Sequence, residues 1–165
     1  MICVKAMCRK AIRIIITTLI LVLLVCNIAC DLLEDRSEGK AVQEDLEREF
    51  KLIRPLPQAG SCDYQASHKS SQAYVGSSYQ TQSAYNEIRA HYDKELLKNG
   101  WKLQSEESTH NWGRDYGGWT ANYCKGQYQA SLHHPGNDPG TGWAYALDLS
   151  WGLGSSNKHC GSNPR

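Results

Sequence analysis

Two histidines and an aspartate in the carboxyl-terminal third of the chain suggest metal chemistry. His133 and His134 are adjacent, and Asp138 follows them in a glycine- and proline-rich loop. Imidazole and carboxylate groups are common zinc ligands. Adjacent side chains on a strand point to opposite faces, however, so the two imidazoles would not converge on one ion. We therefore expect no metal and no cofactor at this position.

A second polar loop places His110 and Asp115 on either side of Trp112. A solvated connection between two strands accounts for these residues better than a catalytic site does. Glu106 and Glu107 precede this loop in a predicted strand. Only one of two adjacent carboxylates can face a given side of a strand, which disfavours a paired acid–base role.

The chain also lacks the short motifs that mark common enzyme sites. It contains no phosphate-cradling glycine loop, no nucleophile elbow and no His-Glu-x-x-His pair. The sequence therefore indicates no catalytic residues. Histidine, aspartate and cysteine side chains that converge in one deep pocket would favour an enzyme over a binding module.

Seven cysteines divide by their position along the chain. Four lie within or before an amino-terminal apolar segment, and three lie beyond it: Cys62, Cys124 and Cys160. In an oxidising compartment these three allow one disulfide and one leftover thiol, and the sequence does not fix the pairing. A structural bridge is the preferred interpretation of Cys124, with a reactive thiol beside a histidine as the alternative. No Cys-x-x-Cys supports a zinc ribbon or a thioredoxin-like site.

Four aromatic residues form a candidate binding surface: Trp112, Tyr116, Trp119 and Trp143. Tyrosine and tryptophan favour binding surfaces because they bury a large area with little loss of conformational entropy. The alternative is that Trp119 and Trp143 fill the edge of the core, and the sequence leaves both interpretations open.

The amino-terminal segment predicts attachment to a membrane. Ile14–Cys30 is a run of 17 residues without a charge, near the lower limit of about 17 residues for a spanning helix. Four bases precede it and acids follow it, so the amino terminus is expected in the cytoplasm and the rest outside. Asn27-Ile28-Ala29-Cys30 also resembles a lipoprotein processing site, which makes Cys30 a candidate for lipidation. Because Asn27 departs from the usual aliphatic residue, we favour an uncleaved anchor.

The next segment, residues 31–54, predicts a stalk. Val42, Leu46, Phe50 and Ile53 recur at helical spacing, which indicates a juxtamembrane helix from about residue 38 to residue 54. A spacer that packs lightly on the domain is preferred over a dimerising coil, because the pattern covers barely two heptads. The prolines at 55 and 57 end the helix. We thus expect an anchor or signal segment over 1–30, a stalk over 31–54, a domain over 55–153 and a flexible tail over 154–165.

The stretch 81–101 predicts the main helix of the domain. Apolar residues recur three and four positions apart, at Tyr85, Ile88, Tyr92 and Leu96. Thr81 or Ser83 is expected to cap its amino end, and Gly100 to end it.

The other elements of the domain are strands. Alternation and β-forming residues predict strands over 72–79, 101–107, 119–124, 127–133 and 143–151, with a short one over 62–67 and a two-residue turn at Lys125-Gly126. One helix among strands predicts an α+β fold. We expect an antiparallel sheet of about five strands with the helix on one face and the other face partly wet.

Part of this pattern resembles small bacterial envelope proteins. The shared residues are Tyr79-x-Thr81, Ile88, Tyr92-x-x-Glu95-Leu96-x-x-x-Gly100-Trp101, Tyr123-x-x-Gly126-x-Tyr128 and Tyr145-x-Leu147-x-Leu149-x-Trp151. The resemblance covers residues 72–151. It implies an amino-terminal anchor or lipoprotein signal followed by one α+β domain without a characterised activity, and it brings no catalytic residues.

Charge and topology together predict a broad function class. The first 30 residues hold four bases and no acid, so the remainder has 14 bases, 17 acids and a net charge of −3. A mildly acidic domain without a basic cluster is a poor nucleic-acid partner. We expect a domain tethered to the inner (cytoplasmic) membrane on its outer side, where it binds an envelope protein or a cell-wall component. The alternative is an envelope hydrolase or redox enzyme.

Overall fold

The computed structural model describes residues 38–111, 113–138, 140–152 and 160. The predicted anchor with Cys30, the start of the stalk, Trp112 and most of the tail lie outside these residues. Within the described part of the chain, no helix is both long and apolar enough to cross a membrane. The compact unit that contains the described residues begins at Glu38.

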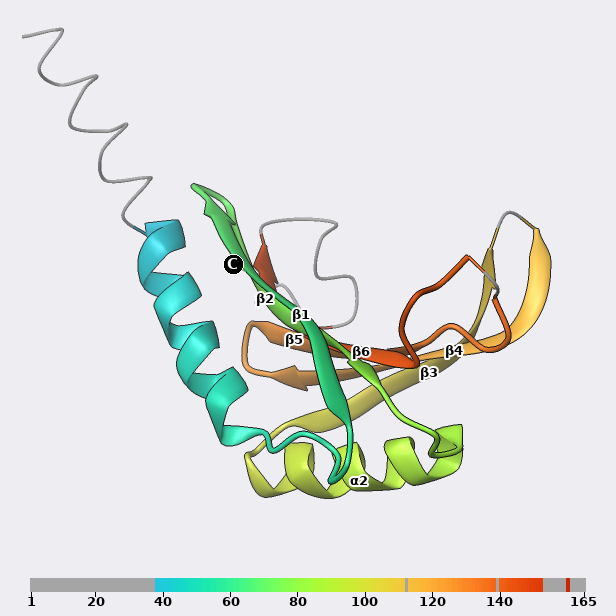
Figure 1. The fold of residues 1–165 in the computed structure, drawn as a ribbon. Helices are drawn as coiled ribbons and strands as arrows, with labels where there is room; N and C mark the ends of the chain where they lie inside the picture. The colour runs from blue at the N-terminus through green and yellow to red at the C-terminus, as the bar shows by residue number, and fades with distance from the viewer. Residues whose placement is uncertain (1–37, 112, 139, 153–159, 161–165) are drawn as a thin grey trace, which may run out of the picture. The chain divides into compact units, whose positions relative to one another are not determined.

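Six strands form one antiparallel sheet in the order β1-β2-β6-β5-β4-β3 (Figure 1). Their bounds are β1 Gly60–Lys69, β2 Gln72–Gln80, β3 Lys102–Asn111, β4 Arg114–Lys125, β5 Tyr128–His134 and β6 Tyr145–Gly152. The predicted α+β class and antiparallel sheet are confirmed, but the strand count of about five is wrong. The additional strand is β1, which was predicted only as a short strand over 62–67; it is ten residues long, and because it is exposed throughout, no alternating pattern marks its full length.

Two helices cover one face of this sheet, where one was predicted. The first covers residues 38–52 of the described chain, and α2 covers Tyr85–Lys98. Tyr128 on β5 donates a hydrogen bond to Asp45 of the first helix at 3.3 Å. Tyr92 of α2 donates to Tyr145 on β6 at 3.1 Å. The register places Tyr128 and Tyr145 on the same face of the sheet, so both helices pack there.

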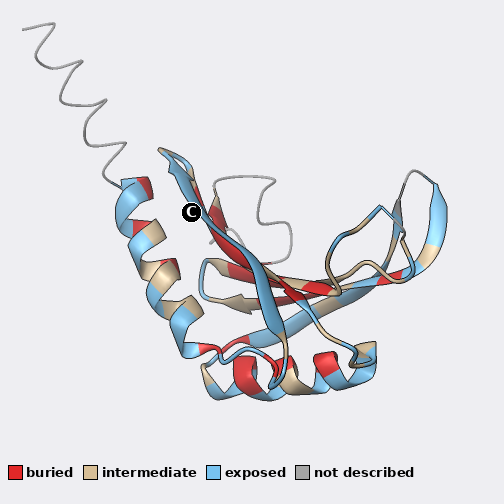
Figure 2. Cartoon of the chain, in the orientation of Figure 1, coloured by how far each residue is buried: buried red, intermediate tan, exposed pale blue. Residues whose placement is uncertain are grey.

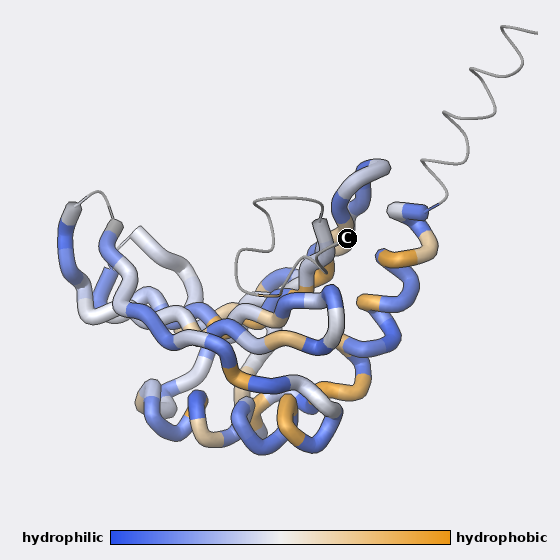
Figure 3. Tube along the Cα trace, turned by 180° about the vertical axis from the view of Figure 1, so that it is seen from behind, coloured by the Kyte–Doolittle hydropathy of each residue, from blue (hydrophilic) through white to orange (hydrophobic). Residues whose placement is uncertain are grey.

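The core lies between the helices and this face. The apolar stripe predicted for α2 is confirmed at Ile88, Tyr92 and Leu96, which are all 0% exposed, whereas Tyr85 at its amino end is half-buried. The period-two strand begins at Tyr145 and not at 143, and its alternate residues from Tyr145 to Trp151 are at most 5% exposed, as the pattern predicted. Figure 2 shows buried segments of α2 turned toward the sheet. Hydrophobic and hydrophilic residues alternate along both helices, as Figure 3 shows.

The two ends of α2 differ in how well the sequence predicted them. The N-cap position is Ala84, and no side chain caps the helix there. Thr81 instead accepts the backbone N–H of Ser83 at 3.2 Å, so the predicted cap by Thr81 or Ser83 is wrong. Ser83 lies one position and Thr81 three positions before the N-cap, so neither residue stands where a side chain caps the helix. Gly100 ends the helix as predicted, with a φ of +85° that favours glycine.

Two hairpins differ from their predicted boundaries. β3 continues to Asn111 and β4 starts at Arg114, so most of the polar stretch predicted as a loop forms a long hairpin. The backbone N–H and C=O groups of the two strands hydrogen-bond to each other, so the hairpin forms without an alternating apolar pattern in its side chains. The turn between β4 and β5 is Gly126-Gln127 and not Lys125-Gly126, since Lys125 pairs with Tyr128. Gly126 still supplies the positive φ, at +60°.

Register shifts occur in the two outer strand pairs. In β1 the shift lies between Ser61 and Asp63. In β3 shifts lie between Leu103 and Ser105 and between Thr109 and His110. Pairings of β2 with β6, β6 with β5 and β5 with β4 keep a continuous register.

The helix predicted for the stalk is part of the same core. Leu46 is fully buried and Val42 is 9% exposed, and both belong to the hydrophobic cluster that includes the sheet. His68 on β1 contacts the side chain of Gln43 with 2.6 Å between Nδ1 and Oε1. The packing is therefore closer than the light contact expected of a spacer.

A disulfide joins Cys124 on β4 to Cys160 in the tail, with the Cα atoms 5.3 Å apart. This is one of the three pairings that the sequence left open. Cys62 remains as a free, exposed thiol. Cys160 is itself buried, so the bridge fixes one point of the tail against the sheet.

Candidate functional site

The face of the sheet opposite the helices bears polar side chains and a cavity of about 700 Å³. Residues from all six strands and from the loop 135–143 line this cavity. The wet face that the sequence predicted is thus partly enclosed. In the following we call this feature the open-face cavity.

The loop after β5 is held against the β3–β4 hairpin to form one wall. Asn137 donates its backbone N–H to the carbonyl oxygen of Tyr116 at 2.8 Å. A Cβ on Gly136, whose φ is +67°, would lie 2.0 Å from that same oxygen, so only glycine fits this approach. Backbone contact of this kind fixes where Tyr116 and the loop side chains stand.

The other end of the loop is tied to β2. Ala144 donates its N–H to the carbonyl oxygen of Tyr79 at 2.8 Å, and Gln80 donates to the carbonyl of Gly142 at 2.5 Å. Trp143 lies between these two attachments and lines the cavity. Both ends of the loop are therefore attached to strands.

A histidine with two side-chain partners stands on the cavity floor. His133 Nε2 lies 3.0 Å from Asp148 Oδ1, and His133 Nδ1 lies 3.0 Å from Thr120 Oγ1. The three residues come from β5, β6 and β4. When Nε2 donates to the carboxylate, the neutral ring accepts the Thr120 hydroxyl proton at Nδ1.

The environment changes the titration of this histidine. Burial lowers the pKa of His133, but the hydrogen bond and negative charge of Asp148 outweigh burial and raise it overall. Burial lowers the pKa of the adjacent His134, which has no such carboxylate. The two neighbouring imidazoles therefore shift in opposite directions, because only one meets an acid.

Tyr74 and Gly76 shape the floor beside Asp148. A Cβ on Gly76 would lie 2.4 Å from the Tyr74 hydroxyl and 2.9 Å from the Asp148 Cβ. The tyrosine ring therefore occupies the space that a side chain at position 76 would fill. Burial and then the charges of Asp148 and Asp63 raise the pKa of Tyr74 to about 12, so the phenol stays protonated at neutral pH.

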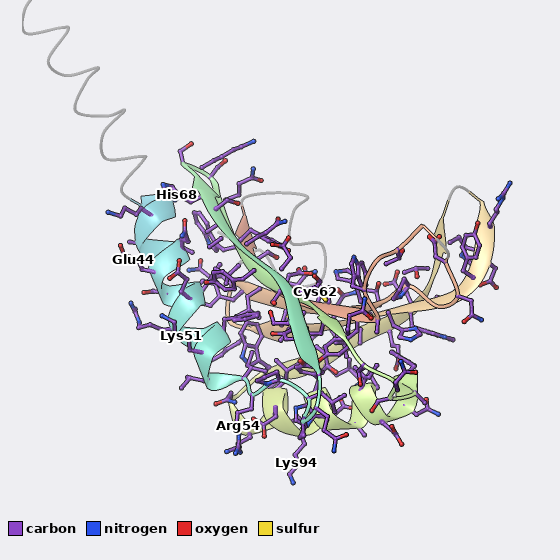
Figure 4. The ribbon with its side chains drawn as sticks, viewed as in Figure 1. Glu44, Lys51, Arg54, Cys62, His68 and Lys94 are labelled. Atoms are coloured by element: carbon purple, nitrogen blue, oxygen red, sulfur yellow. A yellow bond between two sulfur atoms is a disulfide. The ribbon has the colours of Figure 1, made fainter. Side chains whose placement is uncertain are left out.

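Cys62 lies in the cavity wall on β1 (Figure 4). Its sulfur contacts the carbonyl oxygen of Gly60 at 3.9 Å. The thiol is exposed, and it sits at the register shift of the outer strand. Cysteine, histidine and aspartate thus share one cavity, but the contacts of His133 are with threonine and aspartate.

The predicted aromatic surface is divided by the sheet. Tyr116 and Trp143 line the open-face cavity, but Trp119 does not. Trp119 is 39% exposed and stacks on Tyr85 of α2, with ring centroids 6.3 Å apart. Trp112 lies outside the described residues.

The other polar candidates lie apart from one another. Glu106 accepts a hydrogen bond from Tyr85 at 2.5 Å on the helix-covered face. The His134 ring packs on Tyr85, with centroids 5.1 Å apart. His110 pairs with Asp115 across the β3–β4 hairpin. In the described part of the chain, no group of three His, Cys, Asp or Glu side chains could hold a metal ion.

Sequence reasoning missed the contact of His133 with Thr120 and Asp148. Thr120 stands directly opposite His133 in the β4–β5 ladder, and Asp148 is diagonal to it on β6. One signal was present: Asp148 is the only charge in a strand whose alternate residues are apolar. A charge on the polar side of such a strand marks the face that remains in contact with solvent or ligand.

Thr120, His133 and Asp148 contact one another in the same order as the nucleophile, general base and orienting acid of a hydrolase. The Thr120 hydroxyl stands in the place of the nucleophile. Thr120 lies within β4, which pairs with β3 on one side and β5 on the other. The ladders engage the backbone N–H groups on both sides of it. Those groups are then not available to stabilise an oxyanion, which acyl transfer requires. The geometry supports binding and proton exchange better than acyl transfer.

No protein-family model, curated protein or solved structure matches this chain. The resemblance to small bacterial envelope proteins therefore stays a prediction from the sequence.

Proposed function

We propose that the protein is a membrane-tethered extracytoplasmic module that binds an envelope protein or a cell-wall component in the open-face cavity. The observation that carries the proposal is the cavity of about 700 Å³ on the face that both helices leave uncovered. Ligand sites are typically concave, with a few fixed polar groups among larger apolar ones. Tyr116 and Trp143 supply the aromatic area, and His133 with Asp148 supplies oriented polar groups.

Two observations support the location. The charge asymmetry around Ile14–Cys30 favours an outward-facing domain. The disulfide between Cys124 and Cys160 is of the kind that persists in oxidising compartments and is rare in the cytosol. These arguments are independent, because one rests on charges near the amino terminus and the other on the folded domain.

Labelling of Cys62 tests both parts of the proposal. A membrane-impermeant, thiol-reactive benzophenone is added to intact cells that produce the full chain, after the outer membrane, if there is one, has been permeabilised. Cys62 is exposed and lines the cavity, so it should be labelled in a Cys30→Ser background, which removes the thiol at the outer end of the predicted anchor. In that background, Cys62→Ser should abolish labelling. Illumination should then capture an envelope component, which mass spectrometry identifies.

The matched control moves the probe to the helix side of the domain. Glu87 is exposed on α2, so Cys62→Ser combined with Glu87→Cys presents a thiol away from the cavity. The component captured from Cys62 should be absent from the Glu87→Cys reaction. Labelling of Cys62 only after lysis of the inner membrane would contradict the location. The same products from both positions would contradict the binding site.

A hydrolase is the second candidate, and the contacts of His133 with Thr120 and Asp148 favour it. A hydrolase of this type would turn over p-nitrophenyl acetate and would lose that activity with Thr120→Val or His133→Gln. Wild-type turnover no faster than that of Thr120→Val removes this candidate.

A further inference from the structure

We propose that the open-face cavity recognises a ligand through an organic ammonium group, such as a primary amine or a quaternary nitrogen. This inference rests on the proposed binding function and names the chemistry of the ligand. It concerns the side chains that line the cavity, and it does not depend on the identity of the larger molecule that carries the cation.

The lining has a one-sided charge. Asp63, Asp138 and Asp148 belong to the described lining residues, and no lysine or arginine does. The carboxylate of Asp63 accepts a hydrogen bond from Gln65 at 2.7 Å, and Asp138 accepts the N–H of Gly140 at 2.9 Å. Low-dielectric walls concentrate such a field, which attracts cations and repels anions.

Aromatic rings add the second element of cation recognition. Tyr74, Tyr116 and Trp143 all line the same cavity. The face of an aromatic ring is negative, so a cation within about 6 Å of the ring centre is attracted to it, most strongly by tryptophan. Carboxylates together with aromatic faces are the combination that selects a bulky, weakly hydrated cation.

Asp148 is the carboxylate best placed to anchor the ligand. It stands on the central strand β6 and its side chain is 15% exposed, so it is held firmly but still reaches the cavity. Its Oδ1 lies 3.0 Å from His133 Nε2, and the neutral imidazole donates to the carboxylate without cancelling its charge, so the anchor is available while His133 is uncharged. Tyr74 lies beside it over Gly76. A small metal ion does not fit this arrangement, since the described residues offer no group of three close ligands. An organic ammonium group does not need three coordinating ligands.

A pair of probes of the same shape tests the inference. Choline and 3,3-dimethylbutan-1-ol differ only in that a neutral carbon replaces the charged nitrogen. Each is titrated into the full chain in a maltoside detergent, which carries no ammonium group of its own, and binding is followed by saturation-transfer NMR on the methyl signals. Choline should bind at least fivefold more tightly than the neutral alcohol, as expected for cation–π and carboxylate contacts.

Two variants that each remove one negative charge locate the effect. Asp148→Asn should weaken choline binding about fivefold or more, because it removes the charge and keeps the side-chain shape. Glu87→Gln, on the helix side, should leave choline binding unchanged. Replacement of Trp143 by leucine tests the aromatic contribution without touching an acid, and it should also weaken choline binding.

The comparison of choline with the neutral alcohol uses the wild-type protein, so its result does not depend on whether a variant folds. Equal binding of choline and the neutral alcohol would overturn the ammonium inference and leave the cavity as a binding site. Binding of neither probe would overturn it as well, whereas the Cys62 crosslinking result judges the proposed function independently. Loss of choline binding in Glu87→Gln to the same extent as in Asp148→Asn would show that the cavity does not carry the selectivity.

Discussion

The ammonium group of Lys125 lies 2.7 Å from the carboxylate of Glu49, so the turn region of β4 and β5 is joined directly to the first helix. Leu46, one turn earlier in that helix, is fully buried. The helix and the sheet thus share both a polar contact and an apolar one. Removal of the helix would expose part of the core that the sheet itself cannot cover.

We predict that Leu46→Ala destabilises the full chain by about 2–5 kcal/mol, through lost transfer free energy and the cavity that remains. The matched control is Leu52→Ala in the same helix, because Leu52 is 56% exposed. That change should cost less than about 1 kcal/mol. Urea unfolding followed by tryptophan fluorescence measures both. Equal midpoints would mean that the first helix does not pack on the sheet as described.

A second pair of leucines tests the packing of α2. Leu96 is fully buried and its neighbour Leu97 is 60% exposed. Leu96→Ala should lower the free energy of unfolding by about 2–5 kcal/mol and Leu97→Ala by less than about 1 kcal/mol. If Leu97→Ala lowered the free energy of unfolding more than Leu96→Ala does, the opposite face of α2 would have to pack on the sheet.

The disulfide should contribute measurably to stability. It closes a sequence separation of 36 residues between Cys124 and Cys160. In the chain-entropy view, a loop of this size constrains the unfolded chain by about 4 kcal/mol, with about 2–4 kcal/mol typical of measured values. A reducing agent should therefore lower the unfolding midpoint of the wild type.

The control for reduction is the double variant Cys124→Ser, Cys160→Ser, whose midpoint should not respond to the reductant. Cys62→Ser should respond as the wild type does, because Cys62 is free. A response in the double variant, or none in Cys62→Ser, would contradict the assigned pairing.

The pKa of His133 predicts a dependence of stability on pH. Its ordinary value is 6.5, and Asp148 raises it in the folded state despite burial. A raised folded pKa stabilises the protein fully below the unfolded value and loses that contribution as the pH rises through the folded pKa. The groups facing the ring are Asp148 from β6 and the uncharged Thr120 from β4, with the Tyr74 phenol beside Asp148.

The measurement compares the wild type with His133→Gln, which keeps a donor toward Asp148 but cannot take a charge. The wild type should be more stable than the variant at about pH 5.5, and this difference should shrink by about pH 8.5. Because His134 has a lowered pKa and is present in both proteins, its titration cancels in the difference. A difference that grows with pH would contradict the raised pKa.

The parts of the fold that the sequence predicted are those with a strong period. The α2 stripe ending at Leu96 and the alternation from Tyr145 to Trp151 each bury one side, and burial forces a regular spacing. β1 was assigned only as a short strand because all ten of its residues are exposed. Its pairing with β2 depends on backbone hydrogen bonds, which do not constrain the side-chain types along the strand.

The cavity could not be predicted from local patterns. Thr120, His133 and Asp148 belong to three strands, and their meeting depends on a strand order in which β6 lies between β2 and β5. The rule that separates His133 from His134 on a strand correctly kept these two apart. It gave no information about partners across the sheet, since register is a property of the assembled fold.

The register shifts described for the outer strands have a consequence for how copies of the protein behave at high concentration. β1 and β3 are the edges of the sheet, and an unpaired edge is a template on which another chain can add a strand. An extra residue between Ser61 and Asp63 in β1, and another between Leu103 and Ser105 in β3, break the even row of donors and acceptors that such addition needs. Many copies of the domain can therefore be close together without joining edge to edge into one continuous sheet.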